Sequence, residues 1–428
     1  MKHALLLALT ALPLTAAAVD PIALYSFETA DATTTPESVS AGANVATFGP
    51  AGSLAHNSRK LGTGSLRLRP EKANPALPDG DDGAMSSNNY TWATDTRTIA
   101  FWMRAATAQT DSLATMIGLG SGTTNGGRFD IRLNTGTGTS ATTAPGADGL
   151  LRLEVQGGFV ECTAADYTTA NLGITTLRDA KWHHIAVVVP TATATVQSAL
   201  FYIDGVSVPH TSQGTNQAIN TAAGPLRIGD SYQDYARDFK GYLDDVRVYD
   251  IALTAQEVAD LYQSGVTNAS AIAAFEGDPE LLGGGQSTAL TWATTGAPTA
   301  ISIDQGVGNV TGQTSTNATP TGSGVTTYTL SVTTPTGVET AALDITVLGP
   351  VAITSAALGA SGFSLTAINL VPGRSYELQM SENMAEGSWG PLQVFTGPAS
   401  TTQTFTDGVA SSASDRTMFY RIVEAATE

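Results

Sequence analysis

The chain has 428 residues, of which only 14% are charged, while glycine (44) and proline (19) are frequent. Its formal net charge is −18, from 20 basic and 38 acidic residues, and no cluster of Lys and Arg stands out. Nucleic acid is therefore excluded as an expected partner, because phosphate binding needs clustered cations. About 150 residues per domain predicts roughly three domains, and the many turn-forming residues favour all-β sandwiches.

The first residues have the pattern of a signal peptide. Lys2 precedes an apolar run at 4–14, and the small residues 16–18 form an A-x-A ending. The run is too short and wrongly flanked for a membrane span, and no later stretch of about 18 apolar residues follows. We expect a signal peptide at 1–18 and a mature chain that is secreted or at the cell surface, with the periplasm as an alternative.

Strand patterns dominate the next segment, 19–268. Apolar or alternating runs occur at 98–105, 183–189 and 199–208, and each fits a buried or half-buried strand. In the last run Asp204-Gly205 stands between two strand patterns, which is a strong signal for a two-residue hairpin turn.

One helix is predicted in this segment, from Thr254 to about Gln263. Thr254 and Glu257 fit the T-x-x-E capping box, in which each side chain binds the other residue's backbone N–H. Three apolar or aromatic residues then fall on one helix face: Val258, Leu261 and Tyr262. The segment therefore closes with an amphipathic helix.

Two shorter β segments are expected after this helix, at 271–348 and 350–428. Gly- and Thr-rich connectors separate their strand candidates. The candidates are 287–293, 299–304, 326–332 and 338–347 in the first, and 351–356, 375–380, 392–395 and 418–423 in the second. The predicted fold class is therefore all-β, with an N-terminal sandwich followed by two smaller β-sandwiches.

The first segment resembles the laminin-G-like jelly-roll family, which has the concanavalin A-like lectin and glucanase fold. The resemblance rests on the order and spacing of several pieces, not on any one of them. These pieces are IALYSFE (22–28), RTIAFWMR (97–104), KWHHIAVVV (181–189), FYIDG (201–205), LRIGD (226–230) and FKGYLDDVRVYDIALTAQEVADLY (239–262). The family implies a jelly roll that recognises carbohydrate or a surface partner.

The two later segments resemble modules of bacterial exported proteins. GQSTALTWATTGAPTAISID (285–304) and TTYTLSV (326–332) are similar to a bacterial immunoglobulin-like module, with Trp292 and Tyr328 as expected core aromatics. SYELQMS (375–381) and MFYRIVE (418–424), with Trp389 between them, resemble a C-terminal β-sandwich. Both modules would act as spacers or attachment modules.

Catalytic motifs are missing from the sequence, and we expect no catalytic residue. Glucanases similar to this fold use an E-x-D-x-x-E strand to place two carboxylates about the scissile bond, and Glu154 and Glu161 have no second acid at those offsets. His183 and His184 are neighbours on a strand and point to opposite faces, so they cannot easily share a metal. The single cysteine, Cys162, cannot form an intrachain disulfide, and we expect it to be buried.

Adjacent aspartates interrupt the last predicted strand, GYLDDVRVYD. Period-two alternation places Asp244 on the core face with Val246 and Val248. Asp245 and Arg247 then share the opposite face, where they can pair across two residues, and Asp245 is expected to be solvated. An inward carboxylate at Asp244 needs an arginine, backbone donors or a cation.

The resemblance implies calcium at Asp244, because such jelly rolls often tie the first strand region to the last with a structural calcium ion. Glu28 and Asp31, near the first strand, would supply further oxygen ligands, which calcium prefers. A hydrogen-bonded structural aspartate without metal is the alternative. The acidic turn PDGDDG at 78–83 lacks the glutamate of a calcium-binding loop, and we expect it to be solvated.

A loop at 229–239, GDSYQDYARDF, is the candidate ligand site. Tyr232 and Tyr235 offer aromatic faces, and Asp234 lies between them. Rings stack on the C–H faces of sugars and acids accept hydroxyl hydrogen bonds, although ordinary loop packing also explains this composition.

Three functions remain open from the sequence. The first is an exported, non-catalytic binding protein whose jelly roll recognises a polysaccharide, a cell-surface glycan or a surface protein. The second is a structural or adhesion component without glycan specificity, and the third is a glycan-active enzyme. No cofactor other than calcium is expected, and no membrane span.

Overall fold

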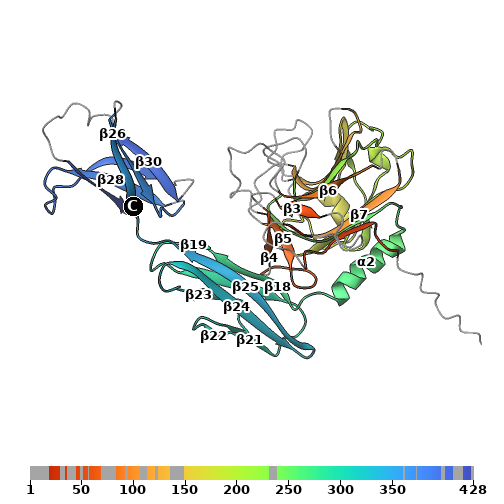
Figure 1. Ribbon diagram of the computed structural model, residues 1–428. Coiled ribbons are helices and arrows are strands. Elements are labelled where there is room, and N and C mark those ends of the chain that lie inside the picture. The colour runs from red at the N-terminus through yellow and green to blue at the C-terminus, as the bar shows by residue number, and fades with distance from the viewer. Residues whose placement is uncertain are drawn as a thin grey trace, which may run out of the picture. The chain divides into compact units, whose positions relative to one another are not determined.

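The computed structural model (Figure 1) describes residues 19–28, 34–35, 45–48, 52–55, 57–68, 83–91, 95–106, 113–120, 124–134, 149–230, 239–359, 362–372, 374–396, 401–407 and 418–425. The chain divides into two compact units. Unit 1 holds Met1–Ala55 and Arg59–Ala269, and unit 2 holds 56–58 and Ser270–Glu428. Strands dominate both units, so the predicted all-β fold class is confirmed.

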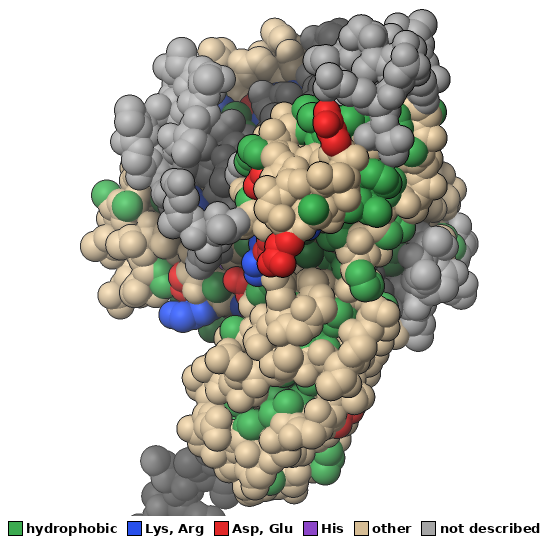
Figure 2. Space-filling model, turned by 90° about the vertical axis from the view of Figure 1, so that its left-hand side faces the viewer, with side chains coloured by type: hydrophobic (Ala, Val, Ile, Leu, Met, Phe, Trp, Pro, Cys, Tyr) green, Lys and Arg blue, Asp and Glu red, His purple; other side chains and the backbone are tan. Residues whose placement is uncertain are grey.

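Charged side chains are sparse on the face shown in Figure 2, where the few Lys and Arg side chains lie close to Asp and Glu side chains. In the part of the chain that the structure describes, no helix has the length and apolar character needed to cross a membrane.

Unit 1 contains two large sheets. The first runs in the order β14-β13-β12-β7-β17-β5-β4, and β1 also pairs with β17. Its strands are β1 (Ala23–Tyr25), β4 (Gly52–Ala55), β5 (Ser65–Leu68), β7 (Arg97–Ala105), β12 (His183–Val189), β13 (Leu200–Ile203), β14 (Val206–Val208) and β17 (Gly241–Tyr249). We call it the eight-stranded sheet.

The second sheet, the nine-stranded sheet, runs in the order β15-β11-β10-β9-β8-β16-β6-β3-β2. Its strands are β2 (Thr34–Thr35), β3 (Ala46–Phe48), β6 (Ala84–Tyr90), β8 (Ala114–Gly120), β9 (Arg128–Asn134), β10 (Leu150–Val155), β11 (Gly158–Glu161), β15 (Ser212–Gln213) and β16 (Gly224–Ile228). The short helix α1 (Ala164–Thr169) follows β11.

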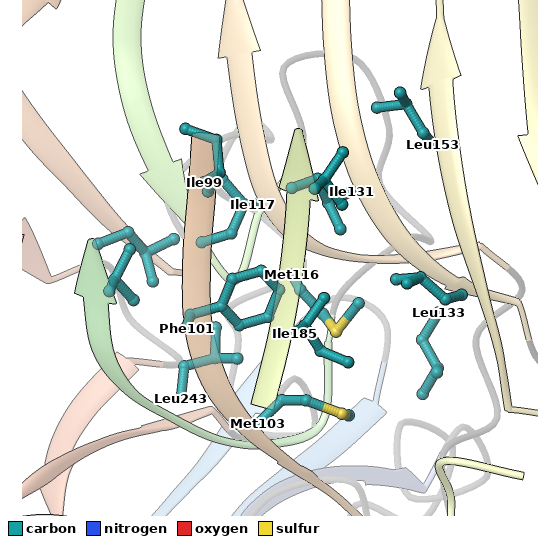
Figure 3. Packing of buried hydrophobic residues seen from close by; sticks show 14 of the residues in the cluster. Ile99, Phe101, Met103, Met116, Ile117, Ile131, Leu133, Leu153, Ile185 and Leu243 are labelled. Atoms are coloured by element: carbon teal, nitrogen blue, oxygen red, sulfur yellow. The ribbon is translucent and has the colours of Figure 1, made fainter. Parts of the chain in front are cut away.

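The core lies between these sheets. Ile99, Phe101 and Met103 alternate along β7, and Ile131 and Leu133 alternate along β9, and all five are fully buried. Figure 3 shows part of this cluster, with side chains of both sheets turned toward one another. Strand alternation thus gives each sheet one apolar face, and the two faces pack together as in a sandwich. Cys162 belongs to the same core, as predicted.

The opposite face of the eight-stranded sheet is covered by the helix α2 (Ala255–Thr267) (Figure 1). Val258 and Leu261 of α2 pack with Ala186 and Tyr249 of the sheet. Thr254 and Glu257 form the predicted capping box, in which Glu257 Oε2 accepts from Thr254 N at 2.7 Å. Because this sheet is buried on both faces, β12 is apolar at successive positions rather than alternating.

The predicted hairpin turn is also present. Asp204 and Gly205 have φ angles of 51° and 77°, and they join β13 to β14. Positive φ at both central residues is what a type I′ turn requires. Any Cβ at Gly205 would lie 3.0 Å from the Tyr262 ring, so the turn and α2 are in close contact.

The two histidines point to opposite faces, as expected. His183 is opposite Met103 and His184 is opposite Trp102 on β7. His183 Nδ1 lies 2.7 Å from Asp204 Oδ2, and its Nε2 lies 3.1 Å from Asp179 Oδ1. Burial alone would lower the pKa of His183, but the hydrogen bonds and charges of the two aspartates raise it to about 9. Burial lowers the pKa of His184 to about 3, so this ring stays neutral.

Unit 2 begins with a two-sheet sandwich. One sheet runs β18-β20-β23 and the other β19-β25-β24-β21-β22. The strands are β18 (Ile272–Asp278), β19 (Leu281–Leu282), β20 (Thr288–Thr294), β21 (Ala300–Ile303), β22 (Gly308–Asn309), β23 (Ser315–Ala318), β24 (Gly324–Thr334) and β25 (Gly337–Val347). Trp292 and Tyr328 are buried in its core, as predicted.

The last part of unit 2 has a separate core around Leu365, Tyr376 and Phe405. Its sheets run β26-β27-β30 and β29-β28-β31. The strands are β26 (Ala352–Gly359), β27 (Gly362–Ile368), β28 (Ser375–Ser381), β29 (Gly390–Thr396), β30 (Thr402–Asp407) and β31 (Phe419–Glu424). We call this part the C-terminal sandwich.

The buried His183 predicts a pH-dependent stability. Its folded-state pKa of about 9 lies above the ordinary value of 6.5, so the stabilisation is complete below pH 6.5 and is lost as the pH rises through 9. The gap corresponds to at most about 3 kcal/mol. In urea unfolding followed by Trp fluorescence, His183→Gln should lose less stability than wild type between these two pH values. Equal losses would contradict an imidazolium at this position.

Candidate functional site

A row of charged side chains covers the face of the nine-stranded sheet that points away from the core. Along β9, Arg128, Asp130 and Arg132 alternate with the core residues Phe129, Ile131 and Leu133. Asp130 is opposite Glu154 on β10, and Arg152 is opposite both Arg132 and Glu161. We call the six residues Arg128, Asp130, Arg132, Arg152, Glu154 and Glu161 the charged face.

Ion pairs connect the charged face across its strands. Arg128 Nε lies 3.0 Å from Asp130 Oδ2, and Arg132 Nη2 donates to the same oxygen at 2.6 Å. Glu154 pairs with all three arginines: with Arg128, with Arg132 at 3.2 Å and with Arg152 at 3.0 Å. Asp130 and Glu154 therefore share the Arg132 guanidinium, which brings two carboxylates from neighbouring strands together.

The row continues onto β11. Arg152 Nη1 lies 3.3 Å from Glu161 Oε2, and Asn134 Nδ2 donates to that oxygen at 2.8 Å. The Arg152 guanidinium also lies over the Phe159 ring, 3.7 Å from its centroid. Arg152 is thus fixed by two carboxylates and an aromatic ring.

Gly118 on β8 lets the row extend to β16. Any Cβ at Gly118 would lie 2.9 Å from the carbonyl oxygen of Asp230 and 3.3 Å from Asp130 Oδ1. On the far side of this glycine, Arg227 Nε lies 3.9 Å from Asp230 Oδ2. A larger residue at 118 would separate the two halves of the row.

The charged face is largely removed from water. Side-chain exposure is 0% for Arg132, 1% for Asp130 and 3% for Arg152, and it is greatest for Glu154, at 13%. Burial raises the pKa of Asp130, and the charges of Arg132 and Arg128 oppose it. Burial likewise raises the pKa of Glu161, against its contacts with Arg152. Such groups are stable only when each charge has its partner.

The chemistry available here suits polyhydroxylated ligands. A carboxylate accepts a hydrogen bond from a hydroxyl, and an adjacent guanidinium donates one, so each pair can hold neighbouring hydroxyl groups. Sequence offsets along a single strand could not find this arrangement, because Asp130 and Glu154 come from different strands. The signal that was present is the alternation of charged and apolar residues in RFDIRLN (128–134).

The predicted ligand residues Tyr232, Asp234 and Tyr235 lie outside the described residues, as does Asp31. The segment that holds the first three begins directly after Asp230, at the end of the charged row. The acidic turn at 78–83 also falls almost wholly outside the described part of the chain.

The predicted orientation of Asp244 is wrong. Asp245 has a φ of 51°, and the pairing of β17 with β7 shifts register between Asp244 and Arg247. This bulge inserts one residue and resets the alternation. Asp244 therefore lies opposite Trp102 on the face toward α2, whereas Val246 and Val248 face the core.

Asp244 is nevertheless fully buried, and backbone groups bind it. Lys60 N and Leu61 N donate to its Oδ2 at 2.9 Å and 3.0 Å. Its Oδ1 is buried and makes no hydrogen bond to any residue that the structure describes. Burial raises the pKa of Asp244 well above its ordinary range, against these two hydrogen bonds, and the nearby charges of Asp245 and Glu28 raise it further.

The predicted Asp245–Arg247 pair is confirmed, but the predicted exposure of Asp245 is wrong. Arg247 Nε donates to Asp245 Oδ2 at 2.8 Å, and Nη2 donates to Oδ1 at 3.1 Å. Only 8% of Asp245 is exposed, because the bulge holds it against its partner.

Glu28, the other described metal candidate, binds the backbone near Asp244. Its Oε2 accepts from Thr63 N at 2.5 Å and from Thr63 Oγ1 at 2.8 Å. Among the described residues, no group of three or more His, Cys, Asp or Glu side chains is arranged to hold a metal ion.

Solved structures with a similar chain path share little sequence with this protein. They include domain 4 of a GH43 extracellular arabinanase from Geobacillus stearothermophilus in complex with arabinotriose (18% identity, 57% of this chain and 100% of that chain, TM-score 0.38). They also include the CBM40 of the Ruminococcus gnavus IT-sialidase bound to α2,3-sialyllactose (13% identity, 40% of this chain and 84% of that chain, TM-score 0.29). A third is the binding domain of Paraclostridial Mosquitocidal Protein 1 (11% identity, 91% of this chain and 97% of that chain, TM-score 0.40).

Family comparison gives a match within unit 1. No curated protein matches the chain. Residues 79–259 match a laminin G family described as the concanavalin A-like lectin/glucanases superfamily. This match and the two packed sheets agree: unit 1 has a jelly-roll fold, and its residues 79–259 are similar to the concanavalin A-like lectin/glucanases superfamily.

Proposed function

We propose that unit 1 is a carbohydrate-binding jelly roll that holds its ligand on the charged face without cleaving it. The observation that carries this proposal is the row of paired arginines and carboxylates on a sheet face that the core does not need. Glu154 and Arg128, the most exposed members, are the groups that a ligand meets first. Tyr232, Asp234 and Tyr235, which follow Asp230 closely in the sequence, stay the predicted aromatic and acidic ligand residues.

The proposal includes export of the chain. The apolar run and the A-x-A ending at 1–18 support removal of a signal peptide and a mature protein that is secreted or at the cell surface. Its partners are then a polysaccharide or a cell-surface glycan or protein. The alternative, a structural or adhesion component without glycan specificity, differs in needing no ligand on the charged face.

A second candidate, glycoside hydrolysis, is favoured by one specific contact. Asp130 and Glu154 lie on opposite strand positions and share Arg132, and burial raises the pKa of Asp130. A raised-pKa acid beside a second carboxylate is the pair that glycosidases use. Both carboxylates are held by arginines on several sides, and this favours binding over proton transfer.

Calcium at Asp244 is part of the proposal, with a bound proton as its competitor. The buried Asp244 Oδ1 has no hydrogen-bond partner among the described residues, and the charge of Glu28 helps to raise the pKa of Asp244. Asp244, Glu28 and Asp31 would hold the ion, which would tie the first strand region to β17. If Asp244 binds a proton instead, as its raised pKa favours, the proton neutralises the buried carboxylate and no metal ion is needed.

Glycan binding is tested with the mature chain on a glycan array, followed by titration of the best ligand. Glu154→Gln and Arg128→Gln should each weaken binding about tenfold or more, because each removes one member of a hydroxyl-binding pair. Lys181→Gln is the matched control, since its side chain is 74% exposed on the same unit. Equal affinity for all four proteins, with unchanged thermal melts, would show that the charged face does not hold the ligand, and no binding by wild type to any glycan would favour the structural alternative.

Catalysis is tested on the same ligand. Wild type should release no new reducing ends from β-glucans, xylans or marine polysaccharides. Turnover that Asp130→Asn or Glu154→Gln abolishes, in a variant that still melts like wild type, would establish the hydrolase instead.

The calcium site is tested by thermal unfolding of the full chain with calcium and with chelator. Chelation should lower the melting temperature of wild type, because an ion at one hundred times its Kd stabilises the folded state by about 2.7 kcal/mol. Asp244→Asn should lose this response. If wild type ignores the chelator and Asp244→Asn is as stable or more stable, a proton occupies the site rather than a metal.

Export is tested by N-terminal sequencing of protein recovered outside the cytoplasm. The first residue should be Val19 or an immediate neighbour. An intact Met1 on exported protein would contradict the signal peptide.

A further inference from the structure

A second polar row lies on the C-terminal sandwich, on the outer face of the sheet β29-β28-β31. Glu377 and Gln379 are two residues apart on β28, so they share a face. The alternating residues Tyr376 and Leu378 point into the core. Arg421 is opposite Gln379 on β31. We call Glu377, Gln379, Arg421 and the nearby Trp389 the tryptophan row.

Hydrogen bonds hold the tryptophan row in a fixed order. Arg421 Nε donates to Gln379 Oε1 at 2.7 Å, and Gln379 Nε2 donates to Glu377 Oε1 at 3.0 Å. The Arg421 guanidinium lies over the Trp389 ring, 4.4 Å from its centroid. Planar groups that are already positioned lose less entropy when a ligand binds.

The row keeps free hydrogen-bonding capacity. Within the described residues, Arg421 uses Nε, while its Nη groups donate no hydrogen bond, and Glu377 accepts only at Oε1. Donors and an acceptor are therefore presented on one surface. Beside them lies Val394, which is opposite Glu377 and 59% exposed.

The other outer face of the same sandwich is different. On the sheet β26-β27-β30, Thr366 and Thr404 bond one another through their hydroxyls at 3.1 Å, and Ser364 bonds the backbone of Ala357. These short side chains use their hydrogen bonds locally. The aromatic ring and the long polar groups are thus concentrated on one of two otherwise equivalent faces.

The charges of the row select its ligand. Arg421 and Glu377 make the row neutral as a pair, whereas the whole chain carries −18. A polyanion would be repelled over the whole surface, while a neutral sugar offers C–H faces for Trp389 and Val394 and hydroxyls for the polar groups.

We propose that the tryptophan row is a second binding site, for a neutral glycan, built on the C-terminal sandwich. It is independent of the charged face and stands if the jelly roll binds nothing. With both sites in one chain, two weak contacts on a polymer add to a stronger attachment.

Affinity electrophoresis of the full chain tests this site, with soluble β-glucan, xylan and galactomannan as neutral probes and alginate as the anionic probe. At least one neutral polymer should retard wild type, and Arg421→Ala and Trp389→Ala should each weaken this retardation about tenfold in apparent Kd. Arg374→Ala is the matched control, since Arg374 is also an exposed arginine of this sandwich, paired with Glu424 at 2.6 Å.

Glu154→Gln separates this proposal from the one for the jelly roll, because it alters only the charged face. Retardation that Glu154→Gln keeps and Arg421→Ala loses assigns the binding to the tryptophan row. Glu377→Gln serves where Trp389→Ala melts early, since it changes one atom and should also weaken binding. Equal retardation of wild type and Arg421→Ala, or no retardation by any neutral polymer, would overturn the proposal.

Discussion

Contact between the apolar faces of the two large sheets is the constraint on which the rest of unit 1 depends. Side chains alternate along each strand, so placing Ile131 and Leu133 in the core forces Asp130 and Arg132 onto the other face. The charged face is a consequence of this packing as much as of any ligand. The packing does not explain the composition of the charged face, because apolar side chains at these buried positions would be at least as stable as three arginines bound to three carboxylates.

Removing these charged groups from water has a cost in free energy. A buried ion pair is seldom more stable than an apolar pair of the same size, and loss of one member costs about 3–5 kcal/mol. The network around Glu154 is therefore an expensive way to make a sheet stable. Recognition of hydroxyl groups, by contrast, requires hydrogen-bond donors and acceptors that are already in position. The tryptophan row also holds its polar groups in position, with fewer charges.

Local signals in the sequence were sufficient where one short stretch determines the structure. The Asp204-Gly205 turn and the Thr254–Glu257 capping box each depend on residues within a few positions, and both are present. The orientation of Asp244 was predicted wrongly because a bulge inserts one residue into β17, and no turn-forming sequence marks that position. The Asp130–Glu154 pair was missed because strand register is a long-range property, set by the packing of the whole sheet.

The double coverage of the eight-stranded sheet also bears on how this domain can be excised. The family match ends at 259, inside α2, and begins at 79, after β1, β4 and β5. A fragment with those bounds would lack β1 and β5, which pair with β17. It would also lack the second half of α2, the helix that packs on Ala186 and Tyr249. An unpaired strand edge beside bare apolar surface is a template for self-association. The soluble folding unit must therefore extend from before Ala23 to beyond Thr267.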